Sequence, residues 1–174
     1  AESDKIDAVY IATPHNFHME QSILFMNHKK HVLCEKPISV NQTQFEKMVH
    51  AAKENKVLLM EAMWTRFLPA TQKVRETIAS KKLGNFKKAY LEFGFSVNGH
   101  VEDEGRLFNP NLAGGSILDI GVYPVAYTLN MTDQSVKSIQ STAKFSKTGI
   151  DVECISEIVF EDDSTATLIS SFPI

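Results

Sequence analysis

The sequence predicts an α/β protein whose first half carries part of a parallel sheet and whose second half is an α+β domain with a largely antiparallel sheet. Two observations predict this class. Before residue 69, short apolar runs alternate with segments whose apolar residues recur every three or four positions, as in strands joined by helices. After residue 84, apolar and polar residues alternate with a period of two, as in a sheet with one face on the core. We expect one domain in residues 1–68 and a second in residues 69–174.

Three strand-like runs in the first half each end in residues that can bind a ligand. They are Ala8–Ala12 before Thr13 and Pro14, His31–Cys34 before Glu35, Lys36 and Pro37, and Val57–Met60 before Glu61, Trp64 and Arg66. Strands separated by helices pair in parallel. Ligands of open α/β sheets bind outside the carboxyl ends of the strands. We therefore expect these three ends to lie side by side and to form a site.

The connecting helices have recognisable ends. Asn16 is expected to cap the first helix, and Asn41 with Gln44 resembles a capping box at the start of the second. Pro69 begins a third helix that is expected to reach Lys82 and to end before Gly84.

The second half contains four expected strands and one apolar helix. The strands are residues 89–95, 136–145, 152–160 and 165–172, with hairpin turns at 147–149 and 161–164. The segment from Leu112 to Met131 has a single charge, Asp119. A helix from Ser116 to Asn130 would have about 15 residues and a length of ~22 Å, less than the ~30 Å of a bilayer core. We interpret it as a buried helix of a soluble protein.

Composition narrows the classes of function. The chain has 174 residues, 43% of them hydrophobic, and a net charge of -3, which gives no indication of a nucleic-acid partner. Cys34 and Cys154 lie in strand-like runs and are expected to be reduced and buried. The first residues lack the layout of a signal peptide. We expect a cytoplasmic protein that does not contact membranes.

The histidines could suggest a metal, because His15 with His18 and His28 with His31 both have the H-x-x-H spacing. No acidic or cysteine ligand stands at a supporting distance, and a usual zinc site needs three or four ligands. We expect no metal site. His18 is expected instead to line the site at the strand ends.

Lys36 allows two interpretations. It is either an exposed lysine in a turn, or an ammonium group that lowers the pKa of a neighbouring acid and holds a substrate oxygen. Pro37 favours the second, because a proline restricts the residue before it to extended backbone. Glu35 would then pair with Lys36 or with the ribose of a cofactor.

Asp119 and Tyr123 are four positions apart and would share one face of the apolar helix. Asp119 could complete a capping box with Ser116, and Tyr123 could be a core aromatic. A buried carboxylate is nevertheless costly without a partner. Gly114 and Gly115 just before it would let the backbone approach a ligand closely. The capped helix and the catalytic acid are compatible interpretations.

A glycine-rich loop of the form G-x-G-x-x-G normally opens a parallel sheet that binds a dinucleotide, and this chain contains none. The other motifs together resemble the glucose-fructose oxidoreductase / inositol dehydrogenase (Gfo/Idh/MocA) family, and most closely its dimeric dihydrodiol dehydrogenases. The motifs are Thr13-Pro14-His15-Asn16-Phe17-His18, Glu35-Lys36-Pro37, Glu61 to Phe67, and Gly114-Gly115-Ser116-Ile117-Leu118-Asp119-Ile120-Gly121-Val122-Tyr123. Many members have histidine where Tyr123 stands, whereas tyrosine resembles the dihydrodiol subgroup.

The resemblance implies that residues 1–68 are the C-terminal half of a Rossmann-type dinucleotide-binding domain, and that residues 69–174 are part of a substrate and dimerisation domain. It implies NAD(P)-dependent oxidation of a secondary alcohol of a sugar, polyol or dihydrodiol by a homodimer formed through the open sheet face. Without the glycine loop, we expect the 174-residue chain alone to bind NAD or NADP weakly and to be inactive.

The resemblance and hydride chemistry also imply roles for single residues. Tyr123 would be the base, made more acidic by Lys36 and positioned by Asp119. The cofactor-binding residues would be Thr13, Pro14, His18, Glu35, Lys36, Trp64 and Arg66. The alternative is a non-catalytic NAD(P)-sensing or interaction module on the same fold, which would be expected to have lost Lys36, Asp119 or Tyr123.

Overall fold

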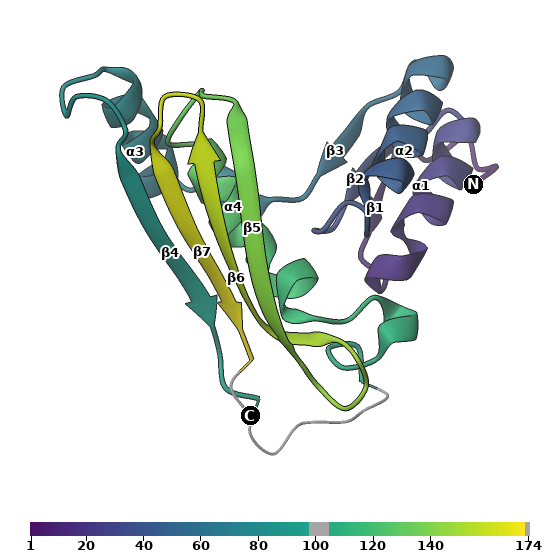
Figure 1. The fold of residues 1–174 in the computed structure, drawn as a ribbon. Helices are drawn as coiled ribbons and strands as arrows, with labels where there is room; N and C mark the ends of the chain where they lie inside the picture. The colour runs from purple at the N-terminus through teal and green to yellow at the C-terminus, as the bar shows by residue number, and fades with distance from the viewer. Residues whose placement is uncertain (98–104, 173–174) are drawn as a thin grey trace. The chain divides into compact units, whose positions relative to one another are not determined.

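The computed structural model describes residues 1–97 and 105–172 (Figure 1). The chain forms two compact units. The first consists of Ala1–Met63 and the short segment Asn111–Gly114, and the second of Trp64–Pro110 and Gly115–Ile174. The first unit therefore includes four residues that are far away in the sequence.

The first unit contains a parallel sheet of three strands in the order β1-β2-β3. The strands are β1 (Ala8–Ile11), β2 (His31–Cys34) and β3 (Leu59–Glu61). Ile11 pairs with Cys34, and Cys34 pairs with Glu61. All three strands thus end at one edge, which confirms the expected position of the segments after β1 and β2. The third strand begins two residues later than expected.

Two helices pack on the sheet, α1 (His18–Asn27) and α2 (Gln42–Asn55). The buried residues between the helices and the sheet form the core of this unit: Ile11, Met26, Val32, Cys34, Met48, Ala51 and Ala52. Tyr10, Leu33 and Met60 form a row across the other face of the sheet and are exposed. Alternation along the strands explains the difference, because successive side chains point to opposite faces.

The two helix starts differ in how well they were predicted. The Asn41 side chain accepts a hydrogen bond of 2.9 Å from the backbone of Gln44, as expected for a cap. In a full capping box the Asn41 amide would donate to the Gln44 side chain. Here the Val40 amide donates to Gln44 Oε1 instead, at 3.4 Å. The prediction for Asn16 is wrong: it lies inside a 3-10 turn, η1 (His15–Phe17), and α1 begins at His18 without a side-chain cap.

The second unit contains a four-stranded sheet in the order β4-β7-β6-β5. The strands are β4 (Lys88–Gly94), β5 (Val136–Phe145), β6 (Asp151–Phe160) and β7 (Thr165–Ser171). The pair β4–β7 is parallel, and the pairs β7–β6 and β6–β5 are antiparallel. The expected largely antiparallel sheet is therefore confirmed.

A short turn and a helix precede this sheet, η2 (Trp64–Phe67) and α3 (Pro69–Ala79). The helix starts at Pro69 as expected but ends before Lys82. Lys81 has a φ of 57° and Gly84 a φ of +81°, and the Gly84 amide bonds to the Lys81 carbonyl at 3.0 Å. After the helix, two residues therefore have left-handed backbone conformation, and one of them is a lysine.

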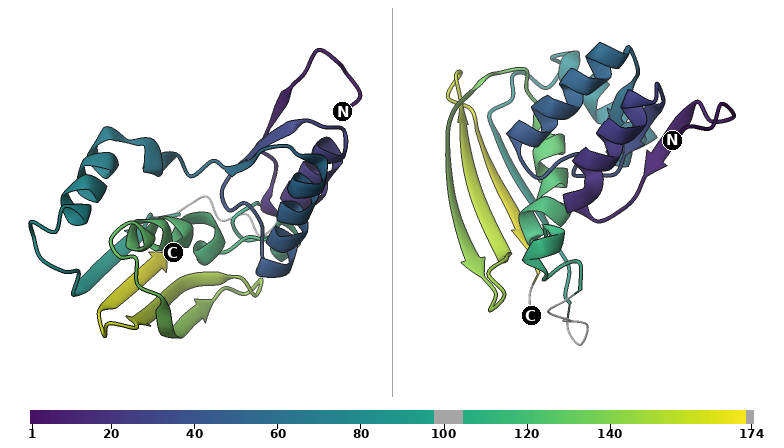
Figure 2. Two further views of the ribbon diagram at one scale, coloured as in Figure 1. Left: turned by 90° about the horizontal axis from the view of Figure 1, so that it is seen from above. Right: turned by 90° about the vertical axis from the view of Figure 1, so that its right-hand side faces the viewer.

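The apolar segment before β5 is divided into three pieces, of which the last two pack on one face of the sheet (Figure 2). They are a 3-10 turn η3 (Pro110–Leu112), a π-helical turn η4 (Ile117–Gly121) and the helix α4 (Val122–Leu129). By length and composition alone, Pro110–Leu129 is the one described helical stretch that could cross a membrane. Its α-helical part has 8 residues, and at ~1.5 Å per residue this is far below a bilayer core.

The segment is held against the sheet by buried residues. Ile120 lies in a cluster with Val97, Phe108, Ile150 and Phe172. A Cβ atom on Gly121 would lie 2.7 Å from Ile117 Cδ1 and 3.3 Å from Ser170 Oγ, so glycine permits this close approach to β7. The interpretation as a buried segment agrees with this packing, although it begins as a π-helical turn instead of an α-helix.

Candidate functional site

Glu35 and Lys36 follow β2 at the carboxyl edge of the parallel sheet. The Glu35 carboxylate accepts hydrogen bonds from the Tyr10 hydroxyl and, at 3.1 Å, from the Lys36 backbone amide. The Glu35 carboxylate raises the pKa of Tyr10, because its hydrogen bond needs the phenol proton. Both side chains after β2 are partly exposed, so they can meet a ligand at this edge.

The turn after Lys36 is fixed by side chains from two other elements. The Ile38 amide donates to Glu61 Oε1 at 3.0 Å, and the Pro37 carbonyl oxygen lies 2.8 Å from His18 Nδ1. The peptide bond between Lys36 and Pro37 is cis. The backbone that carries the Lys36 ammonium is thus anchored to β3 and to α1.

The segment after β1 is fixed in a similar way. Thr13 Oγ1 donates to Gln21 Oε1 at 2.9 Å, and the Thr13 carbonyl oxygen lies 2.8 Å from His18 Nε2. Thr13 and Pro14 are partly exposed, whereas the His18 side chain is fully buried. His18 was expected to line the site; in this unit it holds the two carbonyl groups behind it.

The second unit carries Asp119 and Tyr123. Asp119 lies in η4, is 4% exposed, and forms an ion pair of 2.9 Å with Arg106. The capping box with Ser116 is wrong, because the start of η4 is bonded by other groups and the Asp119 carboxylate has a cation as its partner. Sequence reasoning missed Arg106, although a buried carboxylate in an apolar segment requires such a partner.

Tyr123 lies in α4 between two aromatic rings. The Trp64 indole N–H donates to Tyr123 Oη at 3.1 Å, and the two rings meet edge to face with centroids 6.4 Å apart. The Phe93 ring of β4 lies 5.3 Å from the Tyr123 ring. Trp64 was expected on the nicotinamide side; within this unit it contacts the proposed base. Arg66 is an exposed residue of η2.

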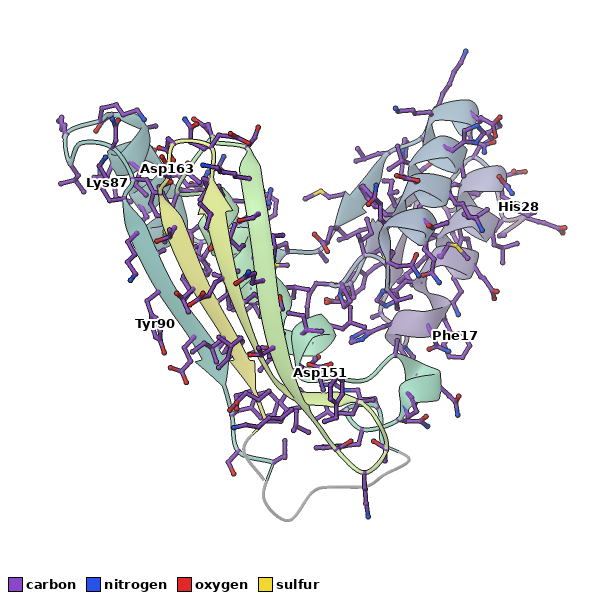
Figure 3. The ribbon with its side chains drawn as sticks, in the orientation of Figure 1. Phe17, His28, Lys87, Tyr90, Asp151 and Asp163 are labelled. Atoms are coloured by element: carbon purple, nitrogen blue, oxygen red, sulfur yellow. The ribbon has the colours of Figure 1, made fainter. Side chains whose placement is uncertain are left out.

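Asp151 is a second residue that sequence reasoning missed. One of its oxygens, Oδ2, accepts from the Ile117 amide and from Ser116 Oγ, both at 2.7 Å (Figure 3). Asp151 begins β6, far from η4 in the sequence, so no local pattern predicts the contact. It supplies the carboxylate at the start of η4 that was assigned to Asp119.

His15 and His31 bond to the backbone. His15 Nδ1 lies 2.9 Å from the Ala113 carbonyl oxygen, and His31 Nδ1 accepts from the Leu58 amide at 2.8 Å. Within residues 1–97 and 105–172, no three His, Cys, Asp or Glu side chains gather to hold a metal ion.

These features define a class of protein: a parallel sheet with a polar carboxyl edge, joined to an α+β unit with a hydrogen-bonded tyrosine, is typical of two-domain nucleotide-dependent oxidoreductases. The model of the oxidoreductase family with an NAD-binding Rossmann fold, GFO/IDH/MocA, matches residues 1–63. The model of the GFO/IDH/MocA C-terminal domain matches residues 71–173. The chain belongs to the GFO/IDH/MocA oxidoreductase family.

Named relatives agree with this assignment. The chain is 35% identical over 161 residues to trans-1,2-dihydrobenzene-1,2-diol dehydrogenase of Danio rerio, covering 92% of this chain and 47% of that protein. It is 40% identical over 157 residues to the NADP(+)-dependent scyllo-inositol 2-dehydrogenase of Bacillus subtilis, covering 88% of this chain and 47% of that protein. The chain thus spans about half the length of the curated relatives it matches.

A solved structure also has the fold of this chain. The aldose-aldose oxidoreductase of Caulobacter crescentus superposes with a TM-score of 0.91 at 22% identity, covering 99% of this chain and 52% of that one. The expected family, the Rossmann-type fold class and NAD or NADP as the cofactor class are confirmed.

Proposed function

We propose that the complete protein is an NAD(P)-dependent dehydrogenase that oxidises a secondary alcohol of a sugar, a polyol or a dihydrodiol. The observation that carries the proposal is the hydrogen bond from Trp64 Nε1 to Tyr123 Oη, on the same helical segment as the Asp119–Arg106 ion pair. The family and the names of the relatives support the reaction class.

The residues at the sheet edge fit a dinucleotide. Glu35 offers carboxylate oxygens to ribose hydroxyls, and Thr13, Pro14 and Lys36 are partly exposed beside it. Trp64 and Arg66 would contribute from η2, and His18 from behind the edge. When bound, the nicotinamide supplies the acceptor for a hydride from the carbinol carbon. Parallel sheets bind ligands at this edge.

The chain's own residues would handle the proton. Tyr123 would take the hydroxyl proton of the alcohol, and the Lys36 ammonium would favour the phenolate and hold the substrate oxygen. Asp119, kept in place by Arg106, would position the helical segment that carries Tyr123. The presence of Lys36, Asp119 and Tyr123 favours an enzyme over a non-catalytic NAD(P)-sensing or interaction module.

The proposed homodimer would use the open face of the four-stranded sheet. On that face, Tyr90, Thr167, Glu157 and Gln140 form one cross-strand row, and Figure 3 shows Tyr90 on β4. Ile169 and Ile155 pair in the next row and are only partly buried. The substitution Ile155→Arg should convert the dimer into a monomer in sedimentation experiments. Lys88→Glu, on the edge strand β4, should have a smaller effect on the fraction of dimer.

We also propose a cytoplasmic location. Both cysteines are free and buried, which suits a reducing compartment. A fusion of the complete protein to a fluorescent protein, followed by fractionation, tests this.

The test of the function is Tyr123→Phe in the complete protein. It removes one hydroxyl and keeps the ring against Phe93 and Trp64. General acid–base groups contribute about 10²- to 10⁴-fold, so kcat should fall by that order while folding and the affinity for NAD or NADP change little. Lys36→Met should lower kcat in a similar way, and the double variant should be far less than additive. A near-normal kcat in Tyr123→Phe with lost stability would make Tyr123 a packing residue. Binding of the dinucleotide without turnover of any polyol or diol would favour the sensing module.

A further inference from the structure

The His18 ring connects the two segments that follow β1 and β2. Its Nε2 lies 2.8 Å from the Thr13 carbonyl oxygen and its Nδ1 lies 2.8 Å from the Pro37 carbonyl oxygen. The side chain is fully buried. One ring therefore joins the candidate cofactor edge at two points, one of them directly after Lys36.

These two contacts define the protonation state of the ring. A carbonyl oxygen only accepts hydrogen bonds, so each ring nitrogen has to donate. A neutral imidazole carries one N–H and one lone pair, and that lone pair would face a carbonyl oxygen at 2.8 Å. Only the imidazolium form makes both bonds.

The charged and titratable surroundings are known from the elements that pack on the ring. From η1, the His15 ring meets His18 edge to face, with centroids 5.8 Å apart, and its own Nδ1 is bonded to the Ala113 carbonyl. Glu35, Lys36 and Glu61 lie at the ends of β2 and β3, and Glu20 lies in the first turn of α1. Burial and the helix N-terminus disfavour a cation, and the two hydrogen bonds to carbonyl oxygens favour it.

We propose that His18 is an imidazolium clamp: a positioning residue that fixes Pro37, and with it the backbone of Lys36, against Thr13. The role of the clamp in catalysis rests on the proposed function of Lys36. The Ile38–Glu61 bond anchors the next residue of the same turn, so the ammonium group of Lys36 starts from a rigid backbone. A displacement of an acting group by about 1 Å can lower a rate by about 100-fold.

The protonation state is tested in the complete protein labelled with ¹⁵N-histidine, by correlating ring nitrogens with ring protons at neutral pH. His18 should show two protonated nitrogens, and its signals are assigned by their loss in His18→Gln. A His18 with one protonated and one bare nitrogen would overturn the clamp. This readout uses the native protein and decides the question even where His18→Gln does not fold.

The positioning role is tested by kinetics. A glutamine has one donor nitrogen and one acceptor oxygen where His18 has two ring nitrogens, so His18→Gln should lower kcat by up to about 100-fold. His28→Gln is the matched control, because His28 bonds to a single carbonyl, that of Leu24, away from the edge. In a Lys36→Met background, His18→Gln should have little further effect on kcat, because it acts through Lys36. An equal loss in both backgrounds would overturn the positioning role, whereas an unchanged kcat in Lys36→Met alone would instead contradict the proposed function.

Discussion

The indole N–H of Trp64 donates a hydrogen bond of 3.1 Å to the hydroxyl oxygen of Tyr123. The phenol oxygen is therefore an acceptor in the resting protein. A donor aimed at this oxygen stabilises it more strongly once it carries a negative charge. The contact thus directs a donor at the oxygen of the proposed base, and it links η2 to α4 inside the second unit.

Trp64→Phe removes this donor and keeps an aromatic ring beside Tyr123. A hydrogen bond to a charged group is worth about 1.5–3 kcal/mol, and because Trp64 is half exposed we expect the low end, a fall in kcat of about 10-fold. Steady-state kinetics of the complete protein measure this fall.

Phe67→Leu is the control for this substitution, since Phe67 is an exposed ring of the same turn. It should leave kcat unchanged. An unchanged kcat in Trp64→Phe would show that the indole donor does not contribute to catalysis.

Arg106→Gln removes the cation that faces the buried Asp119 carboxylate. The carboxylate would lose a charged partner, and we expect unfolding in urea to become easier by about 1–3 kcal/mol. Asp119→Asn should reduce this effect, so the double variant should be less destabilised than the sum of the two single ones. Lys137→Gln is a control at the exposed pair with Asp163, where little measurable change is expected. Strict additivity would contradict the ion-pair explanation.

The sequence predicted the elements whose signals are local. The strand at residues 31–34, the cap at Asn41 and the start of α3 at Pro69 follow from alternation and from capping chemistry, and all three are found. Asn16 failed because it lies inside a 3-10 turn, in which the Phe17 amide bonds to the Pro14 carbonyl at 3.0 Å, instead of in the non-helical backbone that a cap residue needs.

The site was harder to predict, because its contacts are between distant parts of the chain. Arg106, Asp151 and Trp64 meet the segment 116–123 from different parts of the chain, and no spacing rule connects them. The π-helical turn at 117–121 also changes which side chains share a face, since the four-residue rule assumes an α-helix. Residue types pointed to the chemistry, and only the tertiary fold supplied the partners.

Gly115→Ala should strongly destabilise the second unit, for two separable reasons. Gly115 has a φ of +118°, and a Cβ atom there would lie 2.2 Å from Asp151 Oδ1. Asp151→Ala removes the clash but also the carboxylate that bonds Ser116 and Ile117, at a cost of about 1–2 kcal/mol. Urea unfolding of both single variants and the double variant separates the two. The double variant should be less destabilised than the sum of the single effects, because the clash is gone while the backbone strain and the loss of the carboxylate bonds remain. A double variant equal to the sum would mean that the clash is relieved by movement of the backbone.

The buried thiol of Cys34 should make stability depend on pH in the alkaline range. Burial raises the pKa of Cys34 to about 11, whereas an exposed thiol ionises near about 8.5. The folded state keeps the proton to a higher pH than the unfolded state does. This contribution to stability is therefore fully present below pH of about 8.5 and is lost as pH rises to about 11.

Cys34→Ala removes the titrating group at a packing cost that does not depend on pH. The free energy of unfolding of the natural protein should therefore fall more steeply than that of Cys34→Ala across this range, and the two should run parallel below it. The two proteins share every other titratable group, so the difference between the two curves reports Cys34 together with its effect on the pKa of Tyr10, where the bond to Glu35 is the larger cause. Parallel curves throughout would show that the thiol ionises in the folded protein as easily as in the unfolded chain. The Cys34 sulfur, which lies 3.9 Å from the Ile38 carbonyl oxygen, would then not be shielded from solvent.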